Sequence, residues 1–365
     1  MDRPAPSATG SLAPAGREIR AWVEIQGSAD PQAWAERHAA GLVPDHAPYG
    51  LDRLAHYGVE PTFRVPRHGF LHSSLARASR RIAGFSWFEV AGHRPARTAD
   101  VAICWDERYG VPRIIRDGSK LPVATGVIWA TESDASPRLA SLAAKTLRRA
   151  ALVWVLSPPQ IAILRDGWGL PSSRLAYLPF GVDADFFTPA ADVECDPDLV
   201  VSVGNDRHRD HTLLIKAIQL VRRSRPTTRL ELVTRHPVDP APGVVIHAHL
   251  SHTDLRSLYR RAALIAVVTR PNTHVSGATV FLEAMACARP LVTTDNPGVD
   301  SYVSTDRGVL VPPGDVDVLA TGLLGLLSDP AHGAQLARSG REAIDRHFST
   351  ERQARSLALL LKSRI

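Results

Sequence analysis

Two Rossmann-like, doubly wound α/β domains in tandem, facing each other across a cleft, are the fold that this sequence predicts. The chain of 365 residues is too long for one ordinary hydrophobic core, so two domains are expected. Short, almost wholly apolar strands alternate with helices, which is typical of parallel sheets covered on both faces. Residues 183–198, rich in Asp and small residues, interrupt this alternation, which then starts again.

The first 17 residues stand apart from the rest in composition. They are rich in Ala, Pro, Ser and Gly, so we expect a disordered tail over residues 1–17. They lack the basic start and apolar centre of a signal peptide, and no run of 18 apolar residues follows anywhere in the chain. We therefore expect a cytoplasmic protein without a transmembrane helix.

The N-terminal domain is expected over residues 18–182. Its strands are apolar runs, and its helices show apolar residues three or four apart, often after a Pro or Ser that favours a helix start. The segment 42–49 is a loop because it carries Pro44 and Pro48. The predicted strands are 19–25, 60–65, 100–105, 123–129, 151–156 and 174–178, and the helices are 31–40, 50–56, 71–82, 136–149 and 159–166.

Residues 183–198 are the predicted linker, and residues 199–345 form the predicted C-terminal domain. The same two periodicities continue there, and Pro290 ends one helix and leads into a strand. The predicted strands are 199–203, 229–234, 244–247, 264–268, a strand beginning at 291, and 308–311; the helices are 211–222, 253–261, 278–288, 315–327, 331–347 and 350–361. Ligands of such sheets bind at the carboxyl ends of the strands, so the cleft between the domains is the expected active site.

The helix that begins near Ala278 carries the clearest chemical signal. Its start, with Ser276 and Gly277, offers unpaired N–H groups and the positive end of the helix dipole, which suit a phosphate. Glu283 lies one turn further on and leans back toward that start, so it can accept hydrogen bonds from a ribose diol. A core helix with one solvated glutamate has the same local pattern, so both interpretations stay open here.

A second candidate site is the loop after the strand 199–203. Gly204 ends the strand, and Arg207 and Arg209 precede the next helix. The loop lacks the three spaced glycines of the dinucleotide fingerprint, which argues against hydride transfer. Arginine forks bind phosphate in a bidentate manner and can neutralise a leaving diphosphate. The alternative is a solvated basic loop.

Several motifs in the C-terminal half occur together in a characteristic order. They are Leu-Pro-Phe-Gly-Val-Asp at 178–183, Val-Gly at 203–204 with Arg209, Leu-Glu-Ala-Met-Ala at 282–286 with Arg-Pro-Leu-Val-Thr-Thr at 289–294, and Gly-Val-Leu-Val-Pro-Pro-Gly-Asp at 308–315. From about Ser157 to the C-terminus the sequence thereby resembles the retaining glycosyltransferases of glycosyltransferase family 4, which have the GT-B architecture.

This resemblance implies a nucleotide-sugar donor bound mainly by the second domain. Arg209 stands where the family has a Lys that contacts the donor diphosphate. Asn205 stands where an Arg is usual, and Arg207 is the nearest substitute. Glu283 matches the second Glu of the Glu-x7-Glu signature, which holds the nucleotide ribose. The matching implies donor binding by Gly204, Asn205, Arg207 and Arg209, and catalytic roles for Arg209 and Glu283.

The first Glu of that signature is replaced by Val275. In the family this Glu contacts the donor sugar, so its role here passes to a neighbouring polar side chain, His274 or Ser276. Gly277, Ala278 and Thr279 are expected to present backbone N–H groups to the phosphate or the sugar. The family mechanism uses no metal and no cofactor: the leaving phosphate takes the acceptor proton while the sugar transfers on the same face. Residues 346–365 are expected to pack back on the N-terminal domain, as the family's last helices do.

The first domain is expected to bind the acceptor, which is a small molecule, a saccharide or a lipid-linked group. The candidate residues are polar or aromatic groups at strand ends or in the loop 44–49, where solvated turns and sheet-end packing are the alternatives. They are Tyr49, Asp106, Glu107, Trp129 and Glu132. The formal charge of +6 suits a phosphate-bearing ligand or a membrane surface that the protein touches peripherally. No basic stripe interleaved with aromatic residues is present, so no nucleic-acid partner is expected.

Two other classes of protein share parts of this pattern. A sugar-nucleotide epimerase or a phosphorylase has the same fold, although the familiar phosphorylases also carry a pyridoxal lysine and Lys is scarce here. A non-catalytic sugar-nucleotide binding protein is suggested by Val275. The sequence alone does not distinguish these alternatives from a transferase.

Overall fold

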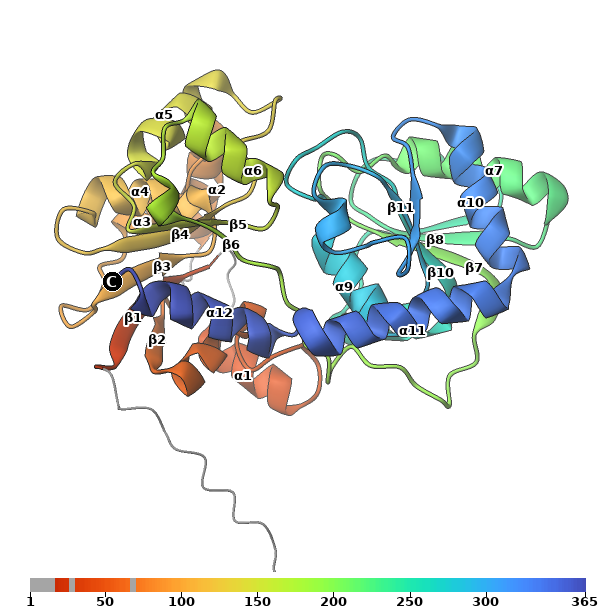
Figure 1. Cartoon of the computed structure of the whole chain (residues 1–365), viewed down its shortest axis with the longest axis horizontal. Helices are drawn as coiled ribbons and strands as arrows, with labels where there is room; N and C mark the ends of the chain where they lie inside the picture. Colours follow the sequence, from red (N-terminus) through yellow and green to blue (C-terminus); the bar gives the residue numbers. More distant parts are fainter. Residues whose placement is uncertain (1–16, 26–29, 66–69) are drawn as a thin grey trace, which may run out of the picture.

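The computed structural model describes residues 17–25, 30–65 and 70–365, and within these it contains two six-stranded parallel sheets. Their strand orders are β2-β1-β3-β4-β5-β6 and β12-β11-β10-β7-β8-β9. In both sheets the order reverses next to the first strand of the domain, as in doubly wound folds. The predicted fold class, two tandem Rossmann-like domains, is confirmed (Figure 1).

The N-terminal domain is built around strands that are buried and almost wholly apolar. Four of them, β1, β3, β4 and β5, occupy the middle of the sheet and fill the core. The strands are β1 (Ile19–Glu24), β2 (Val59–Phe63), β3 (Val101–Cys104), β4 (Val123–Val127), β5 (Leu152–Val155) and β6 (Leu175–Tyr177). The helices are α1 (Pro31–Ala39), η1 (Pro48–Tyr57), α2 (Phe70–Ala83), α3 (Trp87–Ala91), α4 (Glu107–Asp117), α5 (Pro137–Leu147), α6 (Pro159–Ala162), η2 (Ile163–Gly167) and η3 (Ser172–Arg174).

The C-terminal domain repeats this plan. The strands are β7 (Asp196–Val203), β8 (Arg229–Val233), β9 (Val244–His247), β10 (Ala262–Val267), β11 (Leu291–Thr294) and β12 (Val309–Val311). The helices are α7 (His211–Ser224), α8 (His252–Arg261), α9 (Ala278–Ala286), η4 (Val299–Ser301), α10 (Val316–Ser328), α11 (Pro330–His347) and α12 (Thr350–Lys362). None of the described helices combines the length and the apolar character that crossing a membrane requires.

The chain crosses between the domains twice, and the two crossings touch. Val182 pairs with Ser349 in an isolated parallel bridge, where the first crossing meets the start of α12. The helix α12 lies under the N-terminal domain, as Figure 1 shows, and packs against η1. Gln353 Oε1 accepts a hydrogen bond of 2.5 Å from the N–H of Gly181. The last helix thereby ties the C-terminal end of the chain to the first domain.

Several boundaries differ from those predicted. The strand β7 begins at Asp196, so it takes up the end of the expected linker 183–198. The short helices α3 and α4 were not predicted, and the helix predicted over 159–166 is the α-turn α6 followed by the π-turn η2. The expected helix at 50–56 is a 3-10 element that starts at Pro48. The expected disordered tail, apart from Arg17, lies outside the described residues.

Candidate active site

A cavity of about 350 Å³ lies between the domains at the carboxyl ends of their strands. The N-terminal domain contributes the ends of β3, β4 and β5, and the C-terminal domain contributes the loop after β7 and the start of α9. Its lining includes Tyr49, Trp105, Asp106, Trp129, Phe180, Gly204, Asn205, Asp206, Arg209, His274, Val275, Ser276, Gly277, Ala278, Thr279 and Glu283. This is the cleft that the arrangement of two doubly wound sheets predicts.

Arg209 is a buried cation of this cavity. Only 5% of its surface is exposed, and its Nε and Nη1 atoms have no hydrogen-bond partner among the described residues. Burial lowers the pKa of Arg209 to about 10, while the nearby carboxylates of Asp206 and Glu283 oppose that shift. The side chain is therefore charged at neutral pH. A buried, charged donor without partners is costly unless an anion completes it.

Two glycines make room for this guanidinium. A Cβ atom at Gly277 would lie 3.0 Å from Arg209 Nη1 and 2.6 Å from a methyl carbon of Val267. A Cβ at Gly204 would overlap Arg209 Nε. The loop after β7 and the start of α9 therefore approach each other closely only because both positions lack a side chain.

The turn before α9 has unusual backbone geometry. Gly277, the N-cap, has φ 108°, and Val275 has φ 55°, a left-handed conformation that a β-branched residue rarely adopts. Within the described part of the chain, the N–H groups of Gly277 and Thr279 have no hydrogen-bond partner. The helix start thus holds free donors beside Arg209, and backbone strain of this kind is concentrated at functional sites.

Glu283 lies one turn along α9 and lines this cavity and a second one of about 420 Å³. Its Oε2 accepts a hydrogen bond of 2.8 Å from the hydroxyl of Tyr259. Burial raises the pKa of Glu283 to about 7, although the Tyr259 hydrogen bond and the Arg209 charge lower it. The second cavity extends beyond Glu283 and is walled by Trp34, Tyr49, Phe180 and His252 among others.

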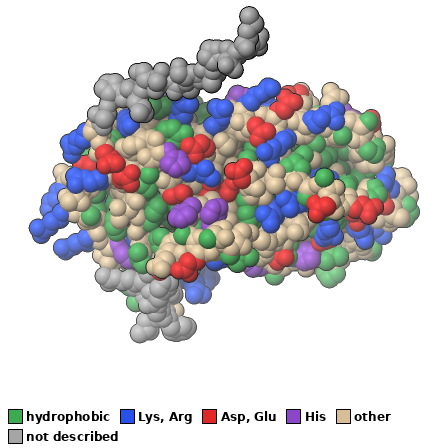
Figure 2. All heavy atoms as spheres, turned by 90° about the horizontal axis from the view of Figure 1, so that it is seen from below, with side chains coloured by type: hydrophobic (Ala, Val, Ile, Leu, Met, Phe, Trp, Pro, Cys, Tyr) green, Lys and Arg blue, Asp and Glu red, His purple; other side chains and the backbone are tan. Residues whose placement is uncertain are grey.

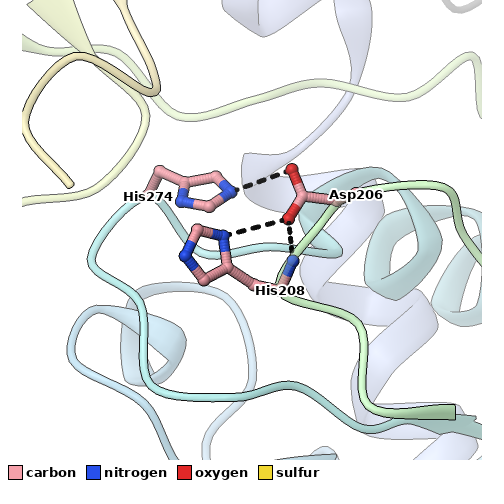
Figure 3. A group of neighbouring side chains, drawn as sticks. All are labelled: Asp206, His208 and His274. Carbon is pink, nitrogen blue, oxygen red and sulfur yellow. Dashed lines mark hydrogen bonds and ion pairs between the residues drawn. The ribbon is translucent and has the colours of Figure 1, made fainter. Parts of the chain in front are cut away.

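A chain of hydrogen bonds crosses the cleft beside this cavity. Glu132, from the loop after β4, accepts from His274 Nδ1 and from the His274 N–H through the same oxygen, at 2.8 Å each. The other imidazole nitrogen of His274 lies 3.2 Å from Asp206 Oδ2. Figure 3 shows Asp206 beside two neighbouring imidazole rings, with His274 on one carboxylate oxygen and His208 on the other. His274 therefore links a carboxylate of each domain.

The charged groups in this chain of hydrogen bonds stabilise one another's ionised forms. Burial alone would lower the pKa of His274, but its hydrogen bonds with Asp206 and Glu132 outweigh burial and raise the pKa to about 9. The same contacts overcome burial at Glu132, whose pKa falls to about 2, and hold the pKa of Asp206 well below its usual range. At neutral pH the structure thus fits an imidazolium between two carboxylates.

These residues also resemble a set of metal ligands. The ligand atoms of Asp206, His208 and His274 lie within 4.8 Å of one another. However, the Asp206 carboxylate also accepts hydrogen bonds from Trp129 Nε1 at 3.1 Å and from Ser276 Oγ at 3.0 Å. The hydrogen-bond network accounts for the geometry of this cluster without an ion.

Among the predicted donor-binding residues, Arg207 is placed differently from the expectation. It does not line the 350 Å³ cavity; its guanidinium points to the other side of the loop and pairs with Asp134 at 2.7 Å. Asn205 lines the cavity, but its Oδ1 accepts from the N–H of Arg235 at 2.6 Å. Residues 206–209 form a tight turn, in which the Asp206 carbonyl accepts from the N–H of Arg209 at 3.0 Å, and Arg209 lines the cavity while Arg207 does not.

The predicted acceptor residues fall into two groups, those that line the cavity and those whose side chains bind other parts of the protein. Tyr49, Asp106 and Trp129 line the cavity, with the Tyr49 ring stacked on Trp105 at a centroid distance of 4.4 Å. Burial, with the charge of Glu107, raises the pKa of Asp106 to about 7.

Glu107 and Glu132 form the second group, and their carboxylates are engaged by other parts of the protein. The carboxylate of Glu107 accepts hydrogen bonds from the N–H groups of Ile128, Trp129 and Ala130, at 2.8, 2.8 and 2.9 Å. It organises the turn after β4. Glu132 instead holds the loop of His274, as described above. Both carboxylates are engaged by the protein itself, so we assign them positioning roles rather than acceptor contacts.

Two residues of the site were missed by sequence reasoning. Asp206 lies in the loop that was singled out, but its neighbours Arg207 and Arg209 drew the assignment. Tyr259, the partner of Glu283, lies on α8 and gives no local signal, because a buried tyrosine on an amphipathic helix looks like core.

Comparison with known proteins places this site in context. Residues 197–329 match the family model described as Glycosyl transferases group 1. A GDP-mannose-dependent monoacylated alpha-(1-6)-phosphatidylinositol monomannoside mannosyltransferase of Corynebacterium glutamicum is 28% identical over 218 residues, which are 51% of this chain and 56% of that protein. The corresponding alpha-(1-6)-phosphatidylinositol monomannoside mannosyltransferase of Mycolicibacterium smegmatis is 31% identical over 53% of this chain and 58% of its own length. The chain thus spans little more than half the length of these relatives.

Solved structures show the same two-domain arrangement. The sucrose-phosphate synthase of Thermosynechococcus elongatus aligns with a TM-score of 0.67 and 19% identity, over 95% of this chain and 99% of that one. The Anabaena protein HepE in complex with UDP and glucose aligns with a TM-score of 0.65 and 15% identity, over 95% of this chain and 100% of that one. These likenesses identify the architecture as GT-B.

Proposed function

We propose that the protein is a retaining glycosyltransferase that moves a hexosyl or related sugar from a nucleotide-sugar donor to an acceptor hydroxyl, without a metal ion. The observation that carries the proposal is Arg209, a buried guanidinium with unpartnered nitrogen atoms beside the free N–H groups of the α9 start. A donor diphosphate is the anion that this arrangement suits. The family match over 197–329 and the named mannosyltransferase relatives support the same conclusion.

In this proposal the donor extends through both cavities. Glu283 lies where they meet, and its carboxylate can accept from the ribose hydroxyls. The nucleoside then extends into the 420 Å³ cavity, where Trp34 and His252 lie edge to face at 5.8 Å. The sugar remains in the 350 Å³ cavity next to Asp106, Trp129 and His274.

In this arrangement catalysis depends on stabilising the leaving diphosphate. As the bond from the anomeric carbon to the phosphate oxygen breaks, negative charge grows on the diphosphate and positive charge on the sugar ring. Arg209 and the N–H groups of the helix start stabilise the negative charge on the diphosphate. The departing phosphate oxygen accepts the proton of the attacking hydroxyl, which approaches from the same face.

The proposal is tested by replacing Arg209. We expect Arg209→Ala to lower kcat by about 10²–10³-fold, as for other removed charge-stabilising donors, and to weaken donor binding much less. Turnover is measured as the release of nucleoside diphosphate from UDP-glucose and GDP-mannose, and binding by calorimetry. Arg235→Ala is the matched control, since Arg235 is exposed and lines neither cavity. Unchanged turnover in Arg209→Ala would contradict the assigned role.

The same assay separates the other classes of protein. An epimerase converts the donor into an isomeric nucleotide sugar without releasing nucleoside diphosphate. A non-catalytic binding protein binds the donors and leaves them intact with every acceptor offered. Either outcome in the wild-type protein would overturn the transferase proposal.

A further inference from the structure

The strongest unassigned feature is a basic cavity of about 440 Å³ on the N-terminal domain. It is formed by α2, the start of α4, the turn after β4 and the start of α5, all of which cluster on one side of that domain in Figure 1. Four arginines line it, and its floor consists of small or apolar residues. The lining is Arg77, Arg81, Gly84, Phe85, Glu107, Arg108, Trp129, Ala130, Ala135, Ser136, Leu139, Ala140 and Arg207.

The positive charge of this cavity is only partly compensated. Among the described residues that line it, Glu107 is the single acid, and its carboxylate is turned inward, where it accepts from three backbone N–H groups. Arg207 pairs with Asp134 at 2.7 Å. Arg77 and Arg81 leave an excess of two positive charges, since no described carboxylate forms an ion pair with either of them. A phosphate monoester carries about −1.5 to −2 charges at neutral pH and balances this excess, whereas the phosphodiester of a lipid headgroup carries about one and balances half of it.

The two arginines of α2 supply donors that can meet such a group. Arg77 and Arg81 are exposed and lie one turn apart, so their side chains share one face of the helix. Within the described ranges, no carboxylate forms an ion pair with either of them. By contrast, basic and acidic side chains are interspersed over the face of the molecule in Figure 2. The cavity therefore concentrates one sign of charge in a way that this face does not.

Trp129 connects this cavity to the candidate active site. Its ring lines both cavities, and its Nε1 donates to Asp206 in the other domain. On the side of the basic cavity, the guanidinium carbon of Arg108 lies 3.7 Å from the centroid of the Trp129 ring. A molecule anchored by an anionic group near Arg77 and Arg81 thus reaches the donor sugar by extending past the edge of Trp129.

We propose that this cavity binds the phosphate group of the acceptor, so that the acceptor is a phosphorylated polyol or sugar, either free or as the headgroup of a lipid. This proposal rests on the proposed transferase function, because it names the substrate of the second cavity. Arginine forks suit phosphate oxygens, and those of Arg77 and Arg81 form no ion pair with a described carboxylate.

The test measures phosphate binding separately from donor binding. Equilibrium dialysis with glycerol 3-phosphate, and with glycerol as the uncharged probe, is compared between the wild type and Arg77→Gln/Arg81→Gln. We expect the double variant to bind glycerol 3-phosphate at least about tenfold more weakly, since two charge-assisted hydrogen bonds are lost. Binding of UDP-glucose or GDP-mannose is expected to stay unchanged. Arg94→Gln/Arg97→Gln, which removes two exposed arginines of the same domain outside the cavity, is the control.

A second arm identifies the source of the phosphate. Vesicles of phosphatidylcholine alone, and of phosphatidylcholine and phosphatidylinositol in equal parts, are sedimented with the protein. Sedimentation with the anionic vesicles that is lost only in Arg77→Gln/Arg81→Gln supports a lipid headgroup. Binding of glycerol 3-phosphate without sedimentation supports a free phosphate ester.

Two results would overturn the proposal. In the first, neither glycerol 3-phosphate nor the anionic vesicles bind the wild type more than their uncharged counterparts do. In the second, the control double variant loses as much binding as Arg77→Gln/Arg81→Gln, which would show a diffuse charge effect. If instead the nucleotide sugars fail to bind while phosphate binds through Arg77 and Arg81, the transferase function fails and the phosphate site stands.

Discussion

Glu283 shows how a single carboxylate can give two pH effects of opposite sign. Burial raises its pKa from the ordinary 4.5 to about 7. Since the folded protein then binds this proton more tightly than the unfolded chain, Glu283 favours folding below about pH 4.5, and that contribution is lost as the pH rises through 7. The proposed ribose binding, in contrast, is stronger with the ionised carboxylate as acceptor, so it improves over the same range.

We therefore expect donor affinity to rise about tenfold between pH 6 and pH 8, because one deprotonation with a pKa near 7 controls it. Glu283→Gln should bind the donor about 1–3 kcal/mol more weakly at pH 8 and lose the pH dependence. Calorimetric titration with GDP-mannose or UDP-glucose measures both. Asp254→Asn, on the neighbouring helix and outside both cavities, is the control. Wild-type affinity in Glu283→Gln would remove the ribose assignment.

The sequence could predict residues whose role depends on their own neighbourhood. Arg209 and Glu283 were found because a loop after a strand and a helix start are local patterns, and both line the cleft. The role of Glu132 could not be found in this way, since its partner Thr273 lies 141 residues away. Glu107 was assigned to the acceptor for the same reason: the N–H groups that occupy it begin 21 residues further along.

At the scale of elements, the helix α4 explains why some boundaries escaped prediction. Gly110 and Pro112 suggest a loop, because each disfavours a helix interior. The proline removes the donor that the carbonyl of Arg108 would use, and the N–H of Ser86 takes its place at 2.8 Å. Gly110 lies so close to Thr125 that a Cβ would come within 2.6 Å of the Thr125 Cβ. Contacts with other elements thus override local propensity.

Docking of α12 on the first domain depends on an equally close approach at Gly50. Its φ is 62°, and a Cβ there would lie 2.7 Å from the Cβ of Thr350. We expect Gly50→Ala to lower the free energy of unfolding by about 2–4 kcal/mol, from backbone strain and overpacking together. Urea unfolding measures the loss.

A second glycine, Gly41, distinguishes the cost of backbone strain from the cost of overpacking. Gly41 has φ 69°, but a Cβ at this position would have no neighbour within 4 Å, so Gly41→Ala should show the backbone cost alone, about 1 kcal/mol. The difference between the two variants is then the cost of displacing α12. Equal losses in both would mean that α12 does not pack tightly at Gly50.

On the scale of the whole molecule, the charged His274 holds the two domains together across the cleft. Its pKa is raised from 6.5 to about 9, so this stabilisation is complete below about pH 6.5 and is lost as the pH rises through 9. We expect the melting temperature of the wild type to exceed that of His274→Gln at pH 7, and the difference to shrink above pH 9. Substitution of the exposed His249 should leave the difference from wild type near zero at every pH. A constant difference for His274→Gln would rule out the titration.

The closed arrangement of the domains should depend on the partner of this histidine. Glu132 accepts hydrogen bonds from four donor groups of Thr273 and His274, and it is almost fully buried. Glutamine keeps an acceptor oxygen but carries no charge, so the buried imidazolium of His274 loses one of its two carboxylate partners, and hydrating it requires the cleft to open. We therefore expect Glu132→Gln to have a larger radius of gyration in small-angle X-ray scattering than the wild type.

Asp134 provides the matched comparison, because it lies in the same loop and also faces the other domain. It pairs with Arg207, but both side chains are about half exposed, and such pairs contribute only about 0–1 kcal/mol. Asp134→Asn should therefore keep the wild-type scattering profile. If both variants scatter like the wild type, the domains are held by apolar contacts such as Phe180 and Val275 in the shared core rather than by the Glu132–His274 chain. If only Glu132→Gln opens, a single buried carboxylate controls access to the donor cavity.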